Sequence, residues 1–408
     1  MNLLMVTAGL PRPVGGANTR NFYVLKALSN THEVSLLVLA NPAEFNESGV
    51  LSPLHEFADS VQLISYKMPS RSKRLIQLLD TVRGRSYFLN LFIVPEMQSA
   101  LNTICSLHHF DVVLFESVIV AGYQLPMGMK SIIDQHNIEH ELSERTFKHV
   151  KAPIRKWYNW RESGLLKRGE IERCRKADAV LVTSEREYDA LRNLIPGQQI
   201  EVIPNGVDTR TFVQRGPVRE ISHHITFTGS MDYFPNIDAV LFFARRCWPI
   251  IQEQLPDATW QIVGKNPPAE IQRLSALPGI TVTGTVPEVQ PYLAVSSVVI
   301  APLQIGSGTR LKILEALAMQ KAVVTTSVGC EGLAVENEKH LLIANRPEEF
   351  AQAVVTLLQN AEWRTKLGNA GRALVEAEYS WEYCGNRLLQ VLETHFVERE
   401  EYASTTDA

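Results

Sequence analysis

The sequence predicts an α/β protein of two domains, each built on a parallel sheet with helices between the strands. Its 408 residues exceed what one hydrophobic core usually holds, and short apolar runs alternate with helical patterns along the chain. The alternation restarts after the turn cluster Pro204–Asp208, which predicts domains over residues 1–204 and 205–380. A final helix is expected over 381–398, followed by a polar, disordered tail over 399–408.

Composition narrows the class of protein. Apolar residues make up 45% and charged residues 21% of the chain, as in ordinary globular proteins, and a net charge of −4 does not indicate nucleic acid as a partner. The five cysteines form no CxxC pair, which argues against a disulfide framework or a zinc site. The N-terminus resembles a first strand rather than a signal peptide, and no apolar run reaches the ~18 residues of a membrane span. The cytoplasm is therefore the expected location.

The apolar runs predict buried parallel strands, because such strands are covered on both faces and need no polar side. In the first half we expect strands at Asn2–Ala8, Val34–Leu39, Val61–Ser65, Asp111–Glu116, Ser131–Asp134, Asp178–Thr183 and Ile200–Ile203. In the second half we expect strands at Ile225–Thr228, Trp260–Val263, Ile280–Thr283, Ser297–Ala301 and Val323–Thr325. Among the helices between and after them, we expect one at Asn236–Ile251 and others between Pro347 and Glu378.

Two glycines follow the first strand and precede a helical pattern. Gly15 and Gly16 are therefore predicted to form a phosphate-facing turn, with a plain tight turn as the alternative. The spacing is not G-x-G-x-x-G, and the second strand ends without the acid that would bind a ribose. A nicotinamide cofactor in this half is disfavoured.

His136 comes directly after the strand Ser131–Asp134. Ligands of open α/β sheets bind at the carboxyl ends of the strands, so His136 is a candidate for the site. The alternative is a structural histidine.

Two basic segments carry apolar and aromatic residues among their Lys and Arg. One runs from Lys67 to Arg85, and the other is a polar helical region from Arg145 to Lys176 that includes Trp157 and Trp160. Such segments can lie on an anionic membrane, and they can equally pack along the edge of a domain.

The stretch Pro302–Thr326 combines a glycine loop, a helix over Thr309–Met319 and a strand. Glycines at a helix N-terminus leave N–H groups for an anion, and Lys312 and Glu315 lie on one helix face. A loop that binds phosphate and a glutamate that binds hydroxyl groups would together suit a sugar nucleotide. The alternative is a surface ion pair worth a few tenths of a kcal/mol.

Several blocks in order resemble the family-4 retaining glycosyltransferases, which have the GT-B fold. They are Gly15-Gly16, Asp134-x-His136-Asn137, Ile203–Asp208, Phe227–Ser230, Ile262–Gly264, Val282–Val286 and Lys312–Ala318. The nearest resemblance is to a bacterial subgroup tied to exopolysaccharide and PEP-CTERM gene clusters.

The resemblance implies two Rossmann-like domains facing across a cleft, with the nucleotide on the second and the acceptor on the first. It also implies that the helix from Trp381 onward crosses back to the first domain. The family's motif has two glutamates, and here the first position is Ser307 and the second is Glu315. The family's Arg and Lys after the first strand of the second domain are absent. Arg310 and Lys312 are the cations left for the diphosphate.

We therefore predict a retaining transferase that moves a sugar from a nucleoside-diphosphate donor to a glycan or lipid-linked acceptor. The predicted catalytic residues are His136, Arg310 and Lys312. The predicted donor-binding residues are Gly15, Gly16, Gly229, Gly264, Lys265, Val286, Ser307, Gly308, Thr309 and Glu315. No D-x-D motif precedes a suitable loop, so no metal or other cofactor is expected.

Two other functions stay open at this stage. One is a sugar-nucleotide epimerase of the same fold, for which Glu116 is the only acid at the strand ends of the first half. The other is a non-catalytic nucleotide-binding component of polysaccharide assembly.

Overall fold

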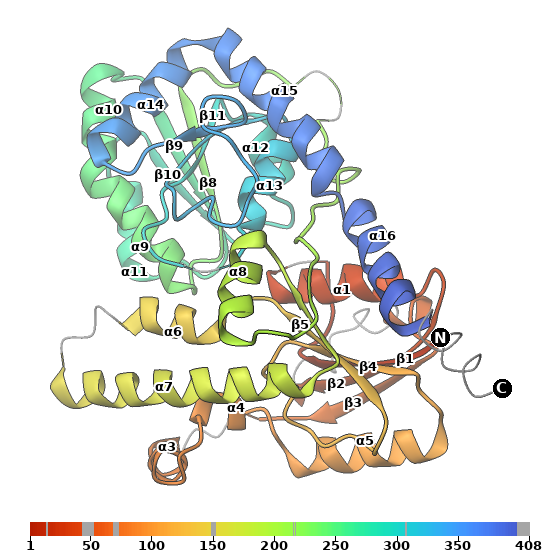
Figure 1. The fold of residues 1–408 in the computed structure, drawn as a ribbon. Helices are drawn as coiled ribbons and strands as arrows, with labels where there is room; N and C mark the ends of the chain where they lie inside the picture. The colour runs from red at the N-terminus through yellow and green to blue at the C-terminus, as the bar shows by residue number, and fades with distance from the viewer. Residues whose placement is uncertain are drawn as a thin grey trace. The chain divides into compact units, whose positions relative to one another are not determined.

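The computed structural model describes residues 1–13, 15–42, 53–67, 73–147, 152–214, 216, 218–306 and 308–397. The chain divides into two compact units, shown in Figure 1. Unit 1 consists of Met1–Pro204 and Cys384–Ala408, and unit 2 consists of Asn205–Tyr383. The predicted tail over 399–408 lies outside the described residues.

Unit 1 is built on a sheet that, within the described residues, has seven parallel strands in the order β3-β2-β1-β4-β5-β6-β7. The strands are β1 (Asn2–Ala8), β2 (Glu33–Ala40), β3 (Ser60–Ser65), β4 (Val112–Glu116), β5 (Lys130–Gln135), β6 (Ala179–Val182) and β7 (Ile200–Val202). They coincide with the expected apolar runs, with small shifts at their ends.

Both faces of this sheet are buried. Leu4 and Val6 of β1 belong to the core on one face, and Leu3 and Met5 belong to the core on the other. The helical segments are α1 (Ala17–Leu28), η1 (Leu54–Glu56), α3 (Lys73–Val82), α4 (Tyr87–Asn90), α5 (Pro95–Leu107), α6 (Glu139–Phe147), α7 (Pro153–Lys176) and α8 (Glu185–Leu194). The expected helical region from Arg145 is thus two helices, and Pro153 begins the second, where its missing N–H costs nothing.

Unit 2 repeats this topology. Within the described residues its sheet has six parallel strands in the order β10-β9-β8-β11-β12-β13. The strands are β8 (His224–Thr228), β9 (Thr259–Val263), β10 (Ile280–Gly284), β11 (Val298–Ala301), β12 (Ala322–Thr325) and β13 (Leu342–Ile343). The short β13 was not predicted.

The helical segments of unit 2 are α9 (Phe234–Phe242), η2 (Phe243–Cys247), α10 (Trp248–Gln254), α11 (Ala269–Gln272), η3 (Arg273–Ala276), α12 (Gln290–Ala294), α13 (Leu311–Ala318), α14 (Pro347–Gln359) and α15 (Ala361–Glu378). The helix expected over Asn236–Ile251 is present, but it is not a regular α-helix throughout. It is α9 and α10 joined by the π-helical turn η2, and Pro249 follows at the start of α10.

The last helix, α16 (Trp381–Leu392), ends in the π-helical turn η4 (Glu393–Val397) and returns to unit 1 from Cys384 onward. Leu388 and Leu392 join the core that includes β1 and β2. A Cβ atom on Gly385 would lie 2.8 Å from Cβ of Ala27, so α16 packs closely on α1 (Figure 1). The expectation that the last helix crosses back is confirmed. None of the described helices is both long and apolar enough to span a lipid bilayer.

Candidate active site

Each sheet has one point where the strand order changes direction. In unit 1 it lies between β1 and β4, and in unit 2 between β8 and β11. Ligands of doubly wound sheets bind beyond the carboxyl ends of the strands at such a point. The residues after these four strands are therefore where each unit is expected to bind a ligand.

In unit 2 the strands β8 and β9 end in closely packed glycines. A Cβ atom on Gly264 would lie 1.8 Å from the carbonyl oxygen of Gly229, so only glycine fits there. The N–H of Gly229 donates to the carbonyl of Val263 at 2.9 Å. The two predicted glycines thus bring backbone groups together beside the point where the order changes.

Lys312 of α13 reaches these glycines. Its Nζ donates to Oδ1 of Asn236 at 2.7 Å and lies 4.2 Å from the centre of the Phe227 ring. A Cβ atom on Gly229 would lie 2.6 Å from the same Nζ. Lys312 therefore places its ammonium at the loop after β8, where the resemblance expects basic side chains that this chain lacks.

Glu315 is not the ion-pair partner of Lys312. No salt bridge joins them, although both residues are described, so the surface-pair interpretation is wrong. The partly buried carboxylate of Glu315 has no hydrogen-bond partner within the described residues. Burial raises the pKa of Glu315 to about 7, against the opposing effect of the Lys312 charge. A carboxylate in this condition can accept hydrogen bonds from ligand hydroxyls.

The protonation of Lys312, like that of Glu315, is sensitive to its surroundings near neutral pH. Burial and the nearby Arg310 charge lower the pKa of Lys312 to about 7, and Glu315 opposes this shift. An anion beside the ammonium would raise the pKa again. Lys312 is thus a cation whose protonation depends on what the site holds.

The loop before α13 is covered by Arg310. One guanidinium nitrogen donates to the carbonyl of Gly308 at 2.7 Å, and a Cβ atom on Gly306 would lie 2.2 Å from another. The hydroxyl of Thr309 is buried without a hydrogen-bond partner. Ser307 lies outside the described residues. The helix begins at Leu311 rather than at the expected Thr309, so Thr309 belongs to the loop.

The remaining predicted residues of unit 2 lie at the ends of β9 and β10. Lys265 is exposed, and its carbonyl accepts a hydrogen bond from the N–H of Met231 at 2.9 Å. Val286 follows β10 and is partly buried.

In unit 1, Gly15 and Gly16 are exposed and precede α1 with φ angles of 92° and 50°. Glycine takes such positive angles without strain. A Cβ atom at either position would meet nothing within 4 Å, so the loop leaves space in front of the helix N-terminus.

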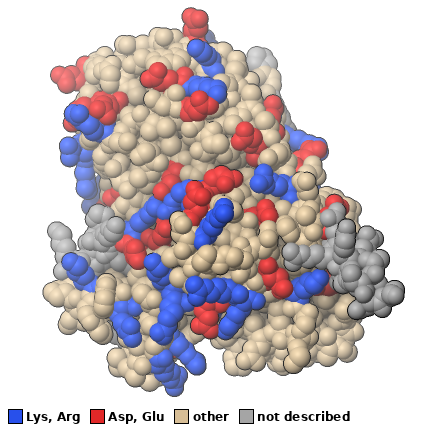
Figure 2. Space-filling view, in the orientation of Figure 1, with Lys and Arg blue, Asp and Glu red and all other residues tan. Residues whose placement is uncertain are grey.

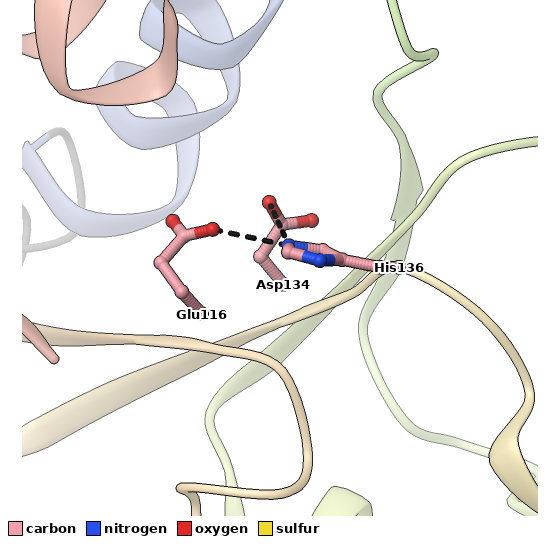
Figure 3. A group of neighbouring side chains, drawn as sticks. All are labelled: Glu116, Asp134 and His136. Carbon is pink, nitrogen blue, oxygen red and sulfur yellow. Dashed lines mark hydrogen bonds and ion pairs between the residues drawn. The ribbon is translucent and has the colours of Figure 1, made fainter. Parts of the chain in front are cut away.

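His136 lies between two carboxylates at the ends of β4 and β5 (Figure 3). Its Nε2 is 3.2 Å from Oε2 of Glu116 and 3.6 Å from Oδ2 of Asp134. Burial disfavours the charged ring, but the hydrogen bonds to Asp134 and Glu116 outweigh it and raise the pKa of His136 to about 9. The ring is therefore protonated at neutral pH.

Arg20 of α1 completes this cluster. Its guanidinium donates to both carboxylate oxygens of Asp134, at 2.6 and 2.7 Å, and to the carbonyl of Pro204 at 3.1 Å. Burial raises the pKa of Asp134, but the Arg20 charge and His136 outweigh it, so that pKa lies well below its usual range. Burial, together with the Asp134 charge, raises the pKa of Glu116 to about 7.

The side chains of Glu116, Asp134 and His136 place possible metal ligands within 4.8 Å of one another. The donor set does not fit a metal ion, however. Both oxygens of Asp134 accept hydrogen bonds from Arg20, whose positive charge would repel a metal ion at that carboxylate. The cluster is better described as a buried network of two cations and two carboxylic groups.

Sequence reasoning missed Arg20 and Asn236. Arg20 had a detectable signal, because it shares one face of its helix with the buried Val24 and Leu28, where a charge needs a partner. Asn236 had no such signal in the sequence, because it lies near Lys312 only in the folded chain.

Comparison with known proteins adds the family. The model described as "Glycosyltransferase Family 4" matches residues 14–211, and "Glycosyl transferases group 1" matches residues 222–360. Among solved structures, sucrose-phosphate synthase from Thermosynechococcus elongatus is 17% identical, with a TM-score of 0.73 over 99% of each chain. Anabaena HepE in complex with UDP is 14% identical, with a TM-score of 0.67 over 97% of this chain and 100% of that one.

One curated relative also matches. It is an uncharacterized 44.6 kDa protein in the cps region of Klebsiella pneumoniae, 23% identical over 164 residues. The match covers 38% of this chain and 42% of that protein, so it spans less than half of the relative.

Proposed function

The chain belongs to glycosyltransferase family 4, with the GT-B fold, and we propose that it transfers a sugar from a nucleoside diphosphate to an acceptor hydroxyl with retention at the anomeric carbon. The observation that carries the proposal is the arrangement in unit 2. A partly buried lysine ammonium lies beside the glycine that follows β8, and a carboxylate without a partner among the described residues lies one helix turn away. This pair matches a diphosphate and a ribose.

The roles in unit 2 follow from charge and position. The ammonium of Lys312 and the guanidinium of Arg310 stabilise the negative charge that develops on the departing diphosphate, together with the N–H groups of Gly308 and Thr309. Glu315 accepts hydrogen bonds from the ribose hydroxyls, and the base lies at the strand ends marked by Lys265 and Val286.

Unit 1 contributes a fixed positive charge and an anion-binding loop. We assign catalysis in unit 1 to the protonated ring of His136, which Glu116 and Asp134 hold in place. The exposed N–H groups at Gly15 and Gly16 suit an anionic part of a substrate.

The reaction proceeds on one face of the sugar. The bond between the acceptor oxygen and the anomeric carbon forms as the bond to the phosphate oxygen breaks, and the acceptor proton passes to that phosphate oxygen. No protein carboxylate acts as a nucleophile. We further propose that the reaction needs no metal, because the cations named above supply the charge that a metal would provide.

A second function is favoured by one observation. Glu116 is buried, its Oε1 has no hydrogen-bond partner, and its pKa of about 7 suits proton transfer at neutral pH. A sugar-nucleotide epimerase would need such a group.

The acceptor belongs to polysaccharide or glycolipid synthesis in this proposal, at the inner face of the plasma membrane. The partial match to a protein of a cps region and the exposed basic residues of α7 support it.

A panel of radiolabelled UDP- and GDP-sugars with a lipid-extract acceptor tests the proposal. We expect label in lipid or glycan, and the coupling constant of the anomeric proton in the product should match that of the donor sugar. A changed sugar without transfer would favour the epimerase, and an inverted anomer would contradict retention. A thermal-shift screen beforehand selects the donor, because a ligand that binds the folded state raises its midpoint.

Nucleotide binding at about pH 8 should be accompanied by uptake of a proton. Lys312, whose pKa is about 7, is mostly neutral there, and a diphosphate beside it restores the charge. Glu315 is already ionised at this pH and contributes little. Calorimetry in two buffers of different ionisation enthalpy measures the uptake. The variant Lys312→Met should bind without it, whereas proton release by the unmodified protein would contradict the role of Lys312.

A further inference from the structure

Helix α3 turns its apolar side outward. Leu75, Leu78, Leu79 and Val82 have the spacing of a single helix face, and their exposed fractions are 59%, 61%, 42% and 78%. We call these four residues the α3 strip. A surface helix ordinarily packs such a face on the core, so the α3 strip lacks a partner within the described residues.

The opposite side of α3 is fixed to unit 1. Asp80 is buried and accepts a hydrogen bond from the side-chain amide of Asn90 in α4 at 3.2 Å. Ile76 and Asp80 line a cavity of about 380 Å³ together with residues of β3 and α5. The outward direction of the α3 strip therefore follows from specific contacts on its other side.

Helix α7 presents a second apolar strip in its first turns. Ile154, Trp157 and Trp160 are 85%, 58% and 72% exposed, and we call them the α7 strip. On the buried side of α7, Glu162 accepts hydrogen bonds from the Ser86 hydroxyl and from the N–H of Phe88 at the start of α4, at 2.7 and 3.0 Å. Helix α4 thus packs against both α3 and α7, and the two strips belong to one part of unit 1.

Within residues 75–85 and 154–162 the exposed charged side chains are all basic. Arg155, Lys156 and Arg161 are exposed among the residues of the α7 strip, and Arg83 and Arg85 are exposed at the end of α3. The acids in these two ranges, Asp80 and Glu162, are both buried. Exposed acids lie nearby at Glu144 of α6, which accepts a hydrogen bond from Ser163, and at Glu172 of α7. Figure 2 shows Lys and Arg side chains gathered over the part of unit 1 where Figure 1 draws α7 and α3.

We propose that the α3 and α7 strips together form a face that docks on an anionic phospholipid bilayer. The Leu, Val, Ile and Trp side chains would enter the boundary between headgroups and acyl chains, and the Arg and Lys side chains would contact lipid phosphates. Trp next to basic residues matches the composition of the boundary between water and lipid. The inference rests on the proposed function, in which the acceptor is at a membrane, and it specifies the surface and the lipid class.

Flotation of the full chain with vesicles tests the proposal. We expect binding to vesicles of phosphatidylcholine with phosphatidylglycerol, little binding to phosphatidylcholine alone, and weaker binding at higher salt. The double variant Leu78→Glu/Trp157→Glu should lose binding. Lys156→Gln/Arg161→Gln should weaken it about 25-fold, because one basic residue near an anionic surface contributes about fivefold (~1 kcal/mol). Leu277→Glu is the matched control, because Leu277 is an exposed apolar residue of unit 2 with 45% exposure.

Transfer to a water-soluble acceptor and the thermal midpoint are measured on the same proteins. Both should be unchanged in the Leu78→Glu/Trp157→Glu variant, which separates docking from folding and chemistry. Absent transfer in every protein, with vesicle binding as expected, would overturn the reaction and leave the docking face standing. Equal binding of variant and control would overturn the docking face. The docking face would also be overturned if the chain formed a dimer that does not bind vesicles and that dissociates in the Leu78→Glu variant.

Discussion

Lys312→Met should lower kcat/KM for the sugar donor by about 10²- to 10³-fold, the usual loss when one group that stabilises a developing anion is removed. Arg310 is the other basic side chain assigned to the diphosphate, and the loop after β8 lacks the Arg and Lys that the family resemblance places there. Arg310→Ala should therefore also be costly, and Glu315→Ala should chiefly raise the KM for the donor through loss of the ribose contacts.

The Lys312→Met variant should keep or raise the thermal midpoint at neutral pH. Burial opposes the charge of Lys312, as its lowered pKa shows, so a methionine of similar length removes a destabilising group. Loss of activity with gain of stability distinguishes a binding cation from a structural one. Lys339→Met is the control, because Lys339 forms an exposed ion pair with Glu336 in unit 2. Normal transfer by both Lys312→Met and Arg310→Ala would end the assignment of the diphosphate site.

Arg20→Met should lower the free energy of unfolding by about 3–5 kcal/mol, because it leaves the buried carboxylate of Asp134 without its partner. The measurement is denaturant unfolding followed by a signal from unit 1. The double variant Arg20→Met/Asp134→Leu should recover much of the loss, since it removes both charges.

An exposed pair provides the comparison for this prediction. Arg210 and Glu382 are joined at 3.3 Å, but their side chains are 87% and 73% exposed. Arg210→Met should change the free energy of unfolding by no more than about 1 kcal/mol. If Arg20→Met lowered the free energy of unfolding by no more than Arg210→Met does, Arg20 would not be essential to the network around Asp134 and His136.

The fold was predictable because buried parallel strands have uninterrupted apolar runs in the sequence. Every run chosen became a strand, and the short β13 was missed because Leu342-Ile343 is too brief to stand out from its surroundings. Helix breaks were harder. The stretch from Asn236 keeps one apolar periodicity through the π-helical turn at Phe243–Cys247, so nothing local marks the change.

Strand ends and glycine loops in the sequence indicate part of the candidate site. Those signals are local in sequence, and they selected Gly229, Gly264 and His136 without any tertiary information. Partnerships across the fold were not accessible in this way. Lys312 and Glu315 were placed on one helix face, with an ion pair between them as the alternative. Lys312 instead donates to Asn236, 76 residues earlier in the chain. Sequence spacing gives the side chains that can meet, and packing decides which of them do.

The composition of unit 1 from two separate parts of the chain bears on how the protein is synthesised. Residues 205–383 complete unit 2 in one continuous segment, whereas unit 1 includes residues from Cys384 onward. Leu388 and Leu392 pack in one core with apolar side chains of β1 and β2. The two strands are synthesised first, so this part of their core is completed only when α16 has been synthesised. On the ribosome, the second unit can therefore finish folding before the first, the reverse of the usual order. Until α16 emerges, the nascent first unit exposes part of its core.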